Sequence, residues 1–151
     1  MSLVKLSTAL RETGRPVCHQ AAARLDTSTA PVFDLHLRHA RLTHKDARVI
    51  AKALGSMGDD GLRLRSFSIS YNPSLGDDGL NARLASLPHT LAELGMVECG
   101  LSDESGTVLW NWAQSAAKLR MMCVEGNRYS PKMRQELSEL SRCNARPSVF
   151  V

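Results

Sequence analysis

Three histidines that lie close together in the sequence are the first candidates for metal chemistry. His36, His39 and His44 form the pattern HxxHx4H, and imidazole nitrogen is a common ligand of zinc. The alternating apolar residues around His36 predict that it points outward from a strand, whereas His44 falls at the start of a helix. Because this pattern does not bring the three rings together, we expect surface histidines, no bound metal and no cofactor.

Two identical strings carry paired aspartates, which are oxygen ligands of the kind that divalent cations prefer. They are Gly58-Asp-Asp-Gly-Leu62 and Gly76-Asp-Asp-Gly-Leu80. The second string falls where a turn leads into a helix, and the helix dipole stabilises acidic side chains there. The first string falls in a longer loop. We therefore expect both strings to have structural roles.

The four cysteines do not form a disulfide framework or a catalytic pattern. They are widely spaced, at Cys18, Cys99, Cys123 and Cys143, so we predict reduced thiols in a cytoplasmic protein. The apolar register buries Cys99 and places Cys123 on an open strand face beside Glu125, whose charge disfavours a thiolate. Neither a Ser, His and Asp set nor a phosphate-binding glycine loop can be assembled. The sequence predicts no enzymatic activity.

Composition and charge narrow the class of partner. A chain of 151 residues with 43% hydrophobic content suits one folded unit, and no stretch approaches the roughly 18 apolar residues of a membrane span. Residues 1–65 carry eleven basic and six acidic side chains, whereas residues 66–129 carry four and seven. Nucleic-acid-binding surfaces concentrate Lys and Arg in one stripe. We therefore expect neither a nucleic acid nor a membrane as partner.

A repeated pattern positions these side chains. Four equivalent apolar residues mark it: Leu35, Phe67, Leu94 and Met122. Their separations are 32, 27 and 28 residues. In each copy the apolar residues first alternate, as in a strand with one buried face, and then recur at helical spacing. A side chain able to cap the first helical turn follows each strand, at Thr43, Asp77, Ser102 and Ser130.

The repeated strand, turn and helix resembles the leucine-rich repeat family, and the period near 28 resembles its ribonuclease-inhibitor-like class. The resemblance covers about residues 32–142. Asn72 and Asn127 follow their strands where a side-chain amide can bond turn backbone groups, as Cys99 can more weakly, while Ala40 takes this place in the first copy. The resemblance implies an α/β fold: a short right-handed solenoid of about four strand-helix repeats with a parallel sheet on its concave face.

Three parts are expected along the chain. Residues 1–30 form an N-terminal helical cap, because an uncovered edge strand invites aggregation and Leu3, Leu6 and Leu10 have helical spacing. Residues 31–143 form the repeats, at about 32–63, 64–90, 91–118 and 119–143. Residues 144–151 form a C-terminal tail that folds back on the last repeat.

The predicted function is a non-catalytic protein-interaction module, an adaptor or scaffold, whose concave strand face binds a protein or peptide. This face changes from cationic to acidic along the repeats, and Tyr71 is the expected anchor because it offers area with a polar tip. A column of small side chains crosses its centre, around Gly95. The outward positions give the candidate binding residues: Asp34, His36, Arg38, His39, Ser68, Ser70, Tyr71, Glu93, Val97, Glu98, Cys123 and Glu125.

Other interpretations are open at this stage. The ribonuclease-inhibitor-like class includes a ribonuclease inhibitor and the activating protein of the Ran GTPase, so the resemblance also implies a regulator of an enzyme as an alternative. A second alternative is a piece of a longer leucine-rich-repeat receptor or effector. The partner is expected to be another protein of unknown identity, with weak self-association through an end of the array or the helix stripe at Trp110 as a further alternative.

Overall fold

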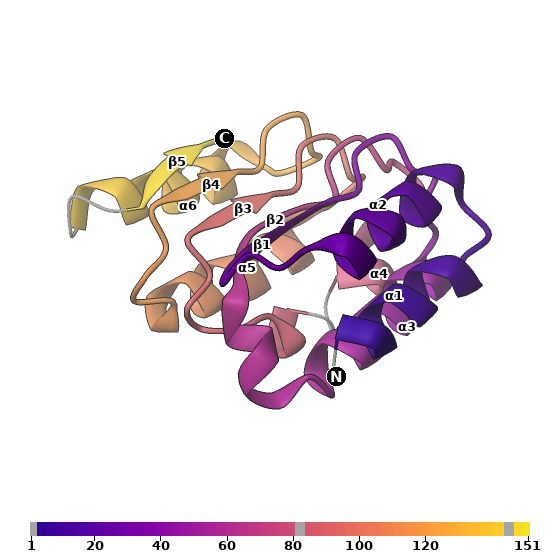
Figure 1. The fold of residues 1–151 in the computed structure, drawn as a ribbon. Coiled ribbons are helices and arrows are strands. Elements are labelled where there is room, and N and C mark those ends of the chain that lie inside the picture. The colour runs from indigo at the N-terminus through magenta and orange to yellow at the C-terminus, as the bar shows by residue number, and fades with distance from the viewer. Residues whose placement is uncertain (1–2, 81–83, 144–146) are drawn as a thin grey trace.

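The computed structural model describes residues 3–80, 84–143 and 147–151, so residues 1–2 of the expected cap and 144–146 of the expected tail lie outside it. Helices and strands alternate after an N-terminal helix pair (Figure 1). In chain order the elements are α1 (Leu3–Glu12), α2 (Pro16–Thr27), β1 (Phe33–His36), α3 (His44–Gly55), the 3-10 helix η1 (Gly58–Arg63), β2 (Leu64–Ser68), α4 (Gly76–Leu80), the 3-10 helix η2 (Leu84–Ser86), β3 (Glu93–Gly95), α5 (Asp103–Ser115), β4 (Met121–Cys123), α6 (Pro131–Cys143) and β5 (Ser148–Phe150).

The strands form one parallel sheet in the order β1-β2-β3-β4-β5. Figure 1 shows them side by side, with α3 and α5 on one side of the sheet. The register aligns the residues that mark the sequence repeat, at Leu35, Phe67, Leu94 and Met122. The predicted α/β alternation and parallel sheet are confirmed.

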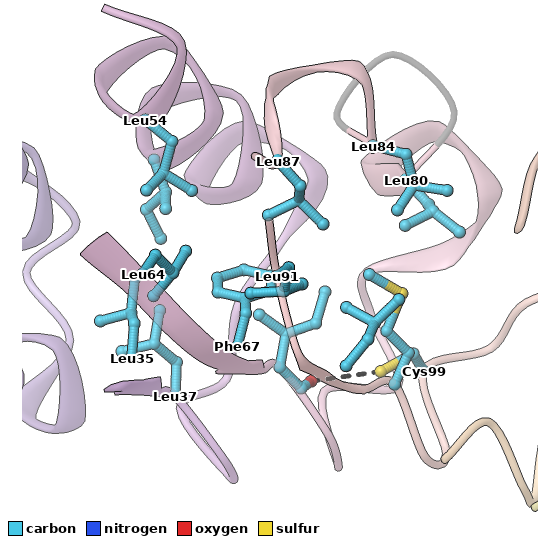
Figure 2. Packing of buried hydrophobic residues seen from close by; sticks show 14 of the residues in the cluster. Leu35, Leu37, Leu54, Leu64, Phe67, Leu80, Leu84, Leu87, Leu91 and Cys99 are labelled. Atoms are coloured by element: carbon cyan, nitrogen blue, oxygen red, sulfur yellow. Dashed lines mark hydrogen bonds between the residues drawn. The ribbon is translucent and has the colours of Figure 1, made fainter. Parts of the chain in front are cut away.

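Leucines fill the space between the strand layer and the helix layer (Figure 2). Leu35 and Leu64 on the strands are each 1% exposed, and Leu54 on α3 is 5% exposed. Burying one such side chain contributes about 1.5–3 kcal/mol. Because every repeat adds its leucines to the same core, neighbouring repeats depend on each other for burial.

A ladder of side-chain amides holds the turns that follow the strands, as predicted. Asn72 Oδ1 accepts hydrogen bonds from the N–H groups of Ala40 (3.1 Å) and Leu42 (3.0 Å). Asn127 Oδ1 accepts in the same way from Cys99 (2.9 Å) and Leu101 (3.1 Å). Each asparagine therefore satisfies the turn of the repeat before its own.

Cys99 occupies the same place between these two asparagines. Its thiol donates to the carbonyl of Ile69 at 3.2 Å, the dashed line in Figure 2. The prediction that Cys99 bonds a turn backbone group is confirmed, and the structure adds that this group belongs to the preceding repeat.

Three of the four predicted helix caps are present. Thr43, Ser102 and Ser130 each accept a hydrogen bond from a first-turn N–H of the helix that follows. The prediction for Asp77 was wrong, because α4 begins one residue earlier, at Gly76. The Asp77 carboxylate instead accepts from the N–H and hydroxyl of Ser102 and the hydroxyl of Ser105. It thereby ties the second repeat to the start of α5.

In the second repeat the described helical residues are α4, Gly76–Leu80, and a 3-10 turn at Leu84–Ser86. Residues 81–83, within the helix predicted after Asp77, lie outside the described part. A small apolar cavity of about 30 Å³ lies between α3 and this segment.

The N-terminal helices pack at the β1 end of the array. Helix α1 contacts α2 and α3, and α2 contacts β1. Arg15 forms an ion pair with Asp46 of α3 at 3.1 Å, and the same Asp46 carboxylate accepts from the N–H of Thr43. Among the described helices, none is long and apolar enough to span a membrane.

The C-terminal residues extend the sheet. Strand β5 pairs with β4, where the Ser148 N–H donates to the Arg120 carbonyl at 2.9 Å and the Val124 N–H donates to the Phe150 carbonyl at 2.8 Å. Where a tail was expected, the described residues 148–150 thus form a fifth strand. The missed signal is the spacing, because Val149 follows Met122 by 27 residues, one more period of the repeat.

Candidate functional site: the open face of the sheet

The outward side chains of the strands form three rows across the sheet, on the surface called here the open face. The first row is Asp34, Ser66, Glu93 and Met121; the second is His36, Ser68, Gly95 and Cys123; the third is Arg38, Ser70, Val97 and Glu125. The third row lies beyond the strand ends, where ladder hydrogen bonds continue the register: Leu37 N–H to the Ser68 carbonyl, Ile69 N–H to Gly95, and Met96 N–H to Cys123. The parallel register therefore fixes the order of side chains along each row.

A groove of about 300 Å³ crosses this face from Arg38 at the β1 side to Glu125 at the β4 side. Eight of the twelve predicted binding residues line it: His36, Arg38, Ser68, Ser70, Glu93, Val97, Cys123 and Glu125. The structure thus brings most of the predicted positions onto one concave surface. Their role in binding stays a prediction.

Gly95 lines the groove beside two serines of the neighbouring repeat. A Cβ atom there would lie 2.8 Å from the Ser68 hydroxyl oxygen and 3.2 Å from that of Ser70. Ser70 was expected to face outward, but it is 3% exposed and its hydroxyl accepts from the Val97 N–H at 3.0 Å. Ser68 donates to Ser70 at 3.2 Å. Ser70 therefore joins its own repeat to the next one, and both hydroxyl groups are hydrogen-bonded rather than free.

The expected anchor, Tyr71, lies at the end of β2 in a cluster with two residues of the first repeat. Its ring stacks on His39 with centroids 4.6 Å apart and planes within 7°, and the Arg38 guanidinium lies 5.1 Å from the ring centroid. His39 and Tyr71 both adopt a left-handed backbone, with φ of 53° and 62°. These contacts fix the ring beside the groove rather than within its lining.

The remaining candidates outside the groove lining contact neighbouring repeats. Asp34 forms a two-point ion pair with Arg65, at 2.7 and 3.1 Å. Glu98 has a left-handed φ of 49°, and its Cγ would lie 2.5 Å from a Cβ built at Gly126. Both acids therefore have structural neighbours on the same face.

The thiols of Cys99 and Cys123 lie in environments that disfavour the thiolate. Burial raises the pKa of Cys99 to about 11. Burial raises the pKa of Cys123 as well, and the carboxylates of Glu125 and Glu93 raise it further. A nucleophilic cysteine needs the opposite shift, so neither thiol is prepared for catalysis.

The three histidines occupy separate environments. His36 shares a hydrogen bond with the Ser66 hydroxyl at 2.8 Å, His39 stacks on Tyr71, and His44 is the first residue of α3. Within the described ranges, no three His, Cys, Asp or Glu side chains come together in a group that could hold a metal ion.

A second groove, of about 570 Å³, depends on the fifth strand. Its lining combines Ser148 and Phe150 of β5 with Arg65, Ala92, Glu93, Arg120 and Met121. It shares Glu93 and Met121 with the first groove. Sequence reasoning missed this part of the face because it treated the last residues as a tail.

Comparisons with known proteins agree with this architecture. No protein-family model matches the chain, and a search of curated proteins finds no match. Among solved structures, it is similar to the Mex67 LRR domain from Chaetomium thermophilum, with a TM-score of 0.52 and 16% identity over 91% of this chain and 85% of that chain. The chain has a leucine-rich-repeat-like fold.

A second structure gives the same result. The fold is similar to that of the Chaetomium Mex67:Mtr2 subunits, with a TM-score of 0.51 and 16% identity over 70% of this chain and 73% of that chain. Identity this low shows the fold alone. The ribonuclease-inhibitor-like class stays a prediction from the sequence period.

Proposed function

We propose that this chain is a non-catalytic adaptor or scaffold that binds a protein partner on the open face of its sheet. The observation that carries the proposal is the groove of about 300 Å³, which receives side chains from four successive strands. A rigid parallel ladder presents these side chains in fixed rows, and such pre-organisation reduces the entropy lost on binding. Free thiols at Cys18, Cys99 and Cys123 support a cytoplasmic location.

The contents of the groove favour binding over chemistry. Its one sulfur nucleophile, Cys123, has a raised pKa. Its hydroxyl groups are hydrogen-bonded, Ser68 to Ser70 and Ser66 to His36. The partner is expected to be a protein because the lining mixes apolar, small and charged side chains across several strands, as protein interfaces do. The same face could regulate an enzyme by covering it, and this alternative shares the binding site.

Site-specific crosslinking tests the location of binding. A photo-crosslinking residue replaces Ser68 on the open face, and a matched variant carries it at the exposed Gln135 on α6. Partners in a native lysate should crosslink to the Ser68 position and not to the Gln135 position. When the Ser68 variant also carries Arg38→Glu and Tyr71→Ala, its crosslink to the partner should weaken. Equal crosslinking at both positions would contradict binding on the open face.

A further inference from the structure

The charges at the two ends of the groove favour one kind of partner. We propose that the groove binds an extended peptide segment that carries an acidic residue opposite Arg38 and a basic residue, about four positions away, opposite Glu125. The segment crosses the strands, so its side chains rather than its backbone make the contacts. This inference rests on the proposed function and names the chemistry of the partner.

The parallel register sets the distance between the two charges. Arg38 and Glu125 occupy the same row, on β1 and β4, with Ser70 and Val97 between them. Neighbouring strands lie about 4.8 Å apart, so three steps across the sheet span roughly 14 Å. An extended chain advances about 3.3 Å per residue. Two charges about four residues apart on such a segment therefore match the two ends of the row.

Both charges are available to a partner. Arg38 and Glu125 are exposed, and neither forms an ion pair with another described residue, in contrast to the Asp34 and Arg65 pair on the same face. The Tyr71 ring beneath the Arg38 guanidinium keeps that charge at the β1 end. Glu93 also lines the groove, but it lies in the first row, away from Glu125.

The middle of the groove accommodates a narrow ligand. Gly95 provides no side chain, and the Ser68 and Ser70 hydroxyls fill the space where its Cβ would stand, at 2.8 and 3.2 Å, so only small groups line this part of the groove. The volume of about 300 Å³ suits a few side chains of an extended segment.

Selection from a random peptide library on phage provides the probe. Twelve-residue peptides are selected on the immobilised wild-type protein, and the binding of the enriched peptide is measured by fluorescence anisotropy at low salt. The expected consensus holds an acidic and a basic residue about four positions apart. Arg38→Glu and Glu125→Lys should each weaken binding by roughly tenfold, because each reversal replaces an attraction with a repulsion.

Matched variants separate charge recognition from changes in net charge. Lys132→Glu and Glu139→Lys make the same charge changes on the exposed surface of α6 and should leave the affinity within about twofold. A peptide whose acidic residue is changed to lysine should lose affinity for the wild type and regain it on the Arg38→Glu variant. Circular dichroism shows that each variant is folded before its affinity is compared.

A blocking variant distinguishes failure of this inference from failure of the proposed function. Val97→Trp fills the middle of the groove, and it should abolish peptide binding. In one outcome, Val97→Trp abolishes binding while the charge reversals leave the affinity unchanged. In that case the inference of a peptide with paired charges is wrong, and binding on the open face is retained. If Val97→Trp has no effect, both are wrong. A library that yields no peptide above background, or a consensus without the paired charges, also overturns the inference.

Discussion

The side-chain oxygen of Asn72 accepts a hydrogen bond from the backbone N–H of Ala40, one repeat earlier, at 3.1 Å. Asn72 also donates to the carbonyl groups of Leu37 (2.9 Å) and Ile69 (2.6 Å). This arrangement explains the residue at position 40. Each ladder asparagine hydrogen-bonds the turn of the repeat before its own. The first repeat has no such preceding turn, so position 40 does not need an asparagine and carries an alanine.

Replacement of the buried Asn72 should therefore strongly lower the stability of the fold. Asn72→Ala leaves several buried backbone groups without partners, and each such group costs about 1–3 kcal/mol. We expect a loss of about 3 kcal/mol in the free energy of unfolding by urea denaturation. Asn127 is only half-buried, so Asn127→Ala should cost less. Asn111→Ala, on an exposed position of α5, is the control, and an equal loss in all three variants would contradict the ladder role.

Gly126 should tolerate no side chain while Glu98 is present. Its φ is +69°, and a Cβ atom would lie 2.5 Å from Glu98 Cγ. Gly126→Ala should lower the free energy of unfolding by about 1–2 kcal/mol. Glu98→Gly removes both the contact and its own left-handed strain, so it should recover part of the loss in the double variant. The idea fails if the two changes are strictly additive in thermal denaturation.

Acid should weaken the link between the second and third repeats. Burial tends to raise the pKa of Asp77, but hydrogen bonds from Ser102 and Ser105 outweigh it and the pKa is lowered. A carboxylate with a lowered pKa stabilises the fold above its unfolded pKa of about 3.9, and this stability is lost as pH falls through the folded value.

Replacement of Asp77 should reduce the dependence of the free energy of unfolding on pH in the acidic range. Asp77→Asn should be less stable than the wild type at pH 7 and should lose less stability on acidification from about pH 4 to pH 2. Urea denaturation across this range measures the effect. Asp78→Asn removes the same charge at the exposed neighbour and should retain the wild-type slope; identical slopes for Asp77→Asn and the wild type would refute the assignment.

Alkylation should distinguish the cysteines. With a pKa of about 11 and full burial, Cys99 should remain unmodified by iodoacetamide at pH 8 in the folded protein. Cys123 is half-buried and should react slowly, and Glu125→Gln should accelerate its reaction by removing a charge that raises its pKa. Peptide mass mapping assigns the modified residue. No acceleration in Glu125→Gln, with Glu139→Gln as control, would contradict the electrostatic cause.

The free edge of the sheet is partly occupied by a side chain. The Ser141 hydroxyl accepts the Val149 N–H at 2.9 Å on the outer side of β5. Unpaired edge groups invite strand pairing between molecules, so Ser141→Ala should increase self-association, measured by light scattering during size-exclusion chromatography. Ser115→Ala at an exposed position of α5 is the matched control and should behave as the wild type.

The repeat architecture follows from the pattern of apolar residues alone. Leu35, Phe67, Leu94 and Met122 stand at near-constant spacing, and each is followed by a change from strand to helix periodicity. These patterns depend on local geometry. Apolar residues repeat every two positions along a strand and every 3.6 along a helix when one face of the element is buried. The ladder role of Asn72 and Asn127 could also be predicted from the sequence, because each stands at the same position after its strand.

Contacts between repeats determine which open-face residues are available to a partner. Ser70 has the outward position of its strand, yet a neighbouring repeat supplies the Val97 N–H that buries and occupies it. Tyr71 and Asp77 are likewise engaged by residues from other repeats. Such contacts join positions about 25–32 residues apart. The spacing of apolar residues in the sequence gives the period of the repeats, but it does not give the distances between side chains of different repeats.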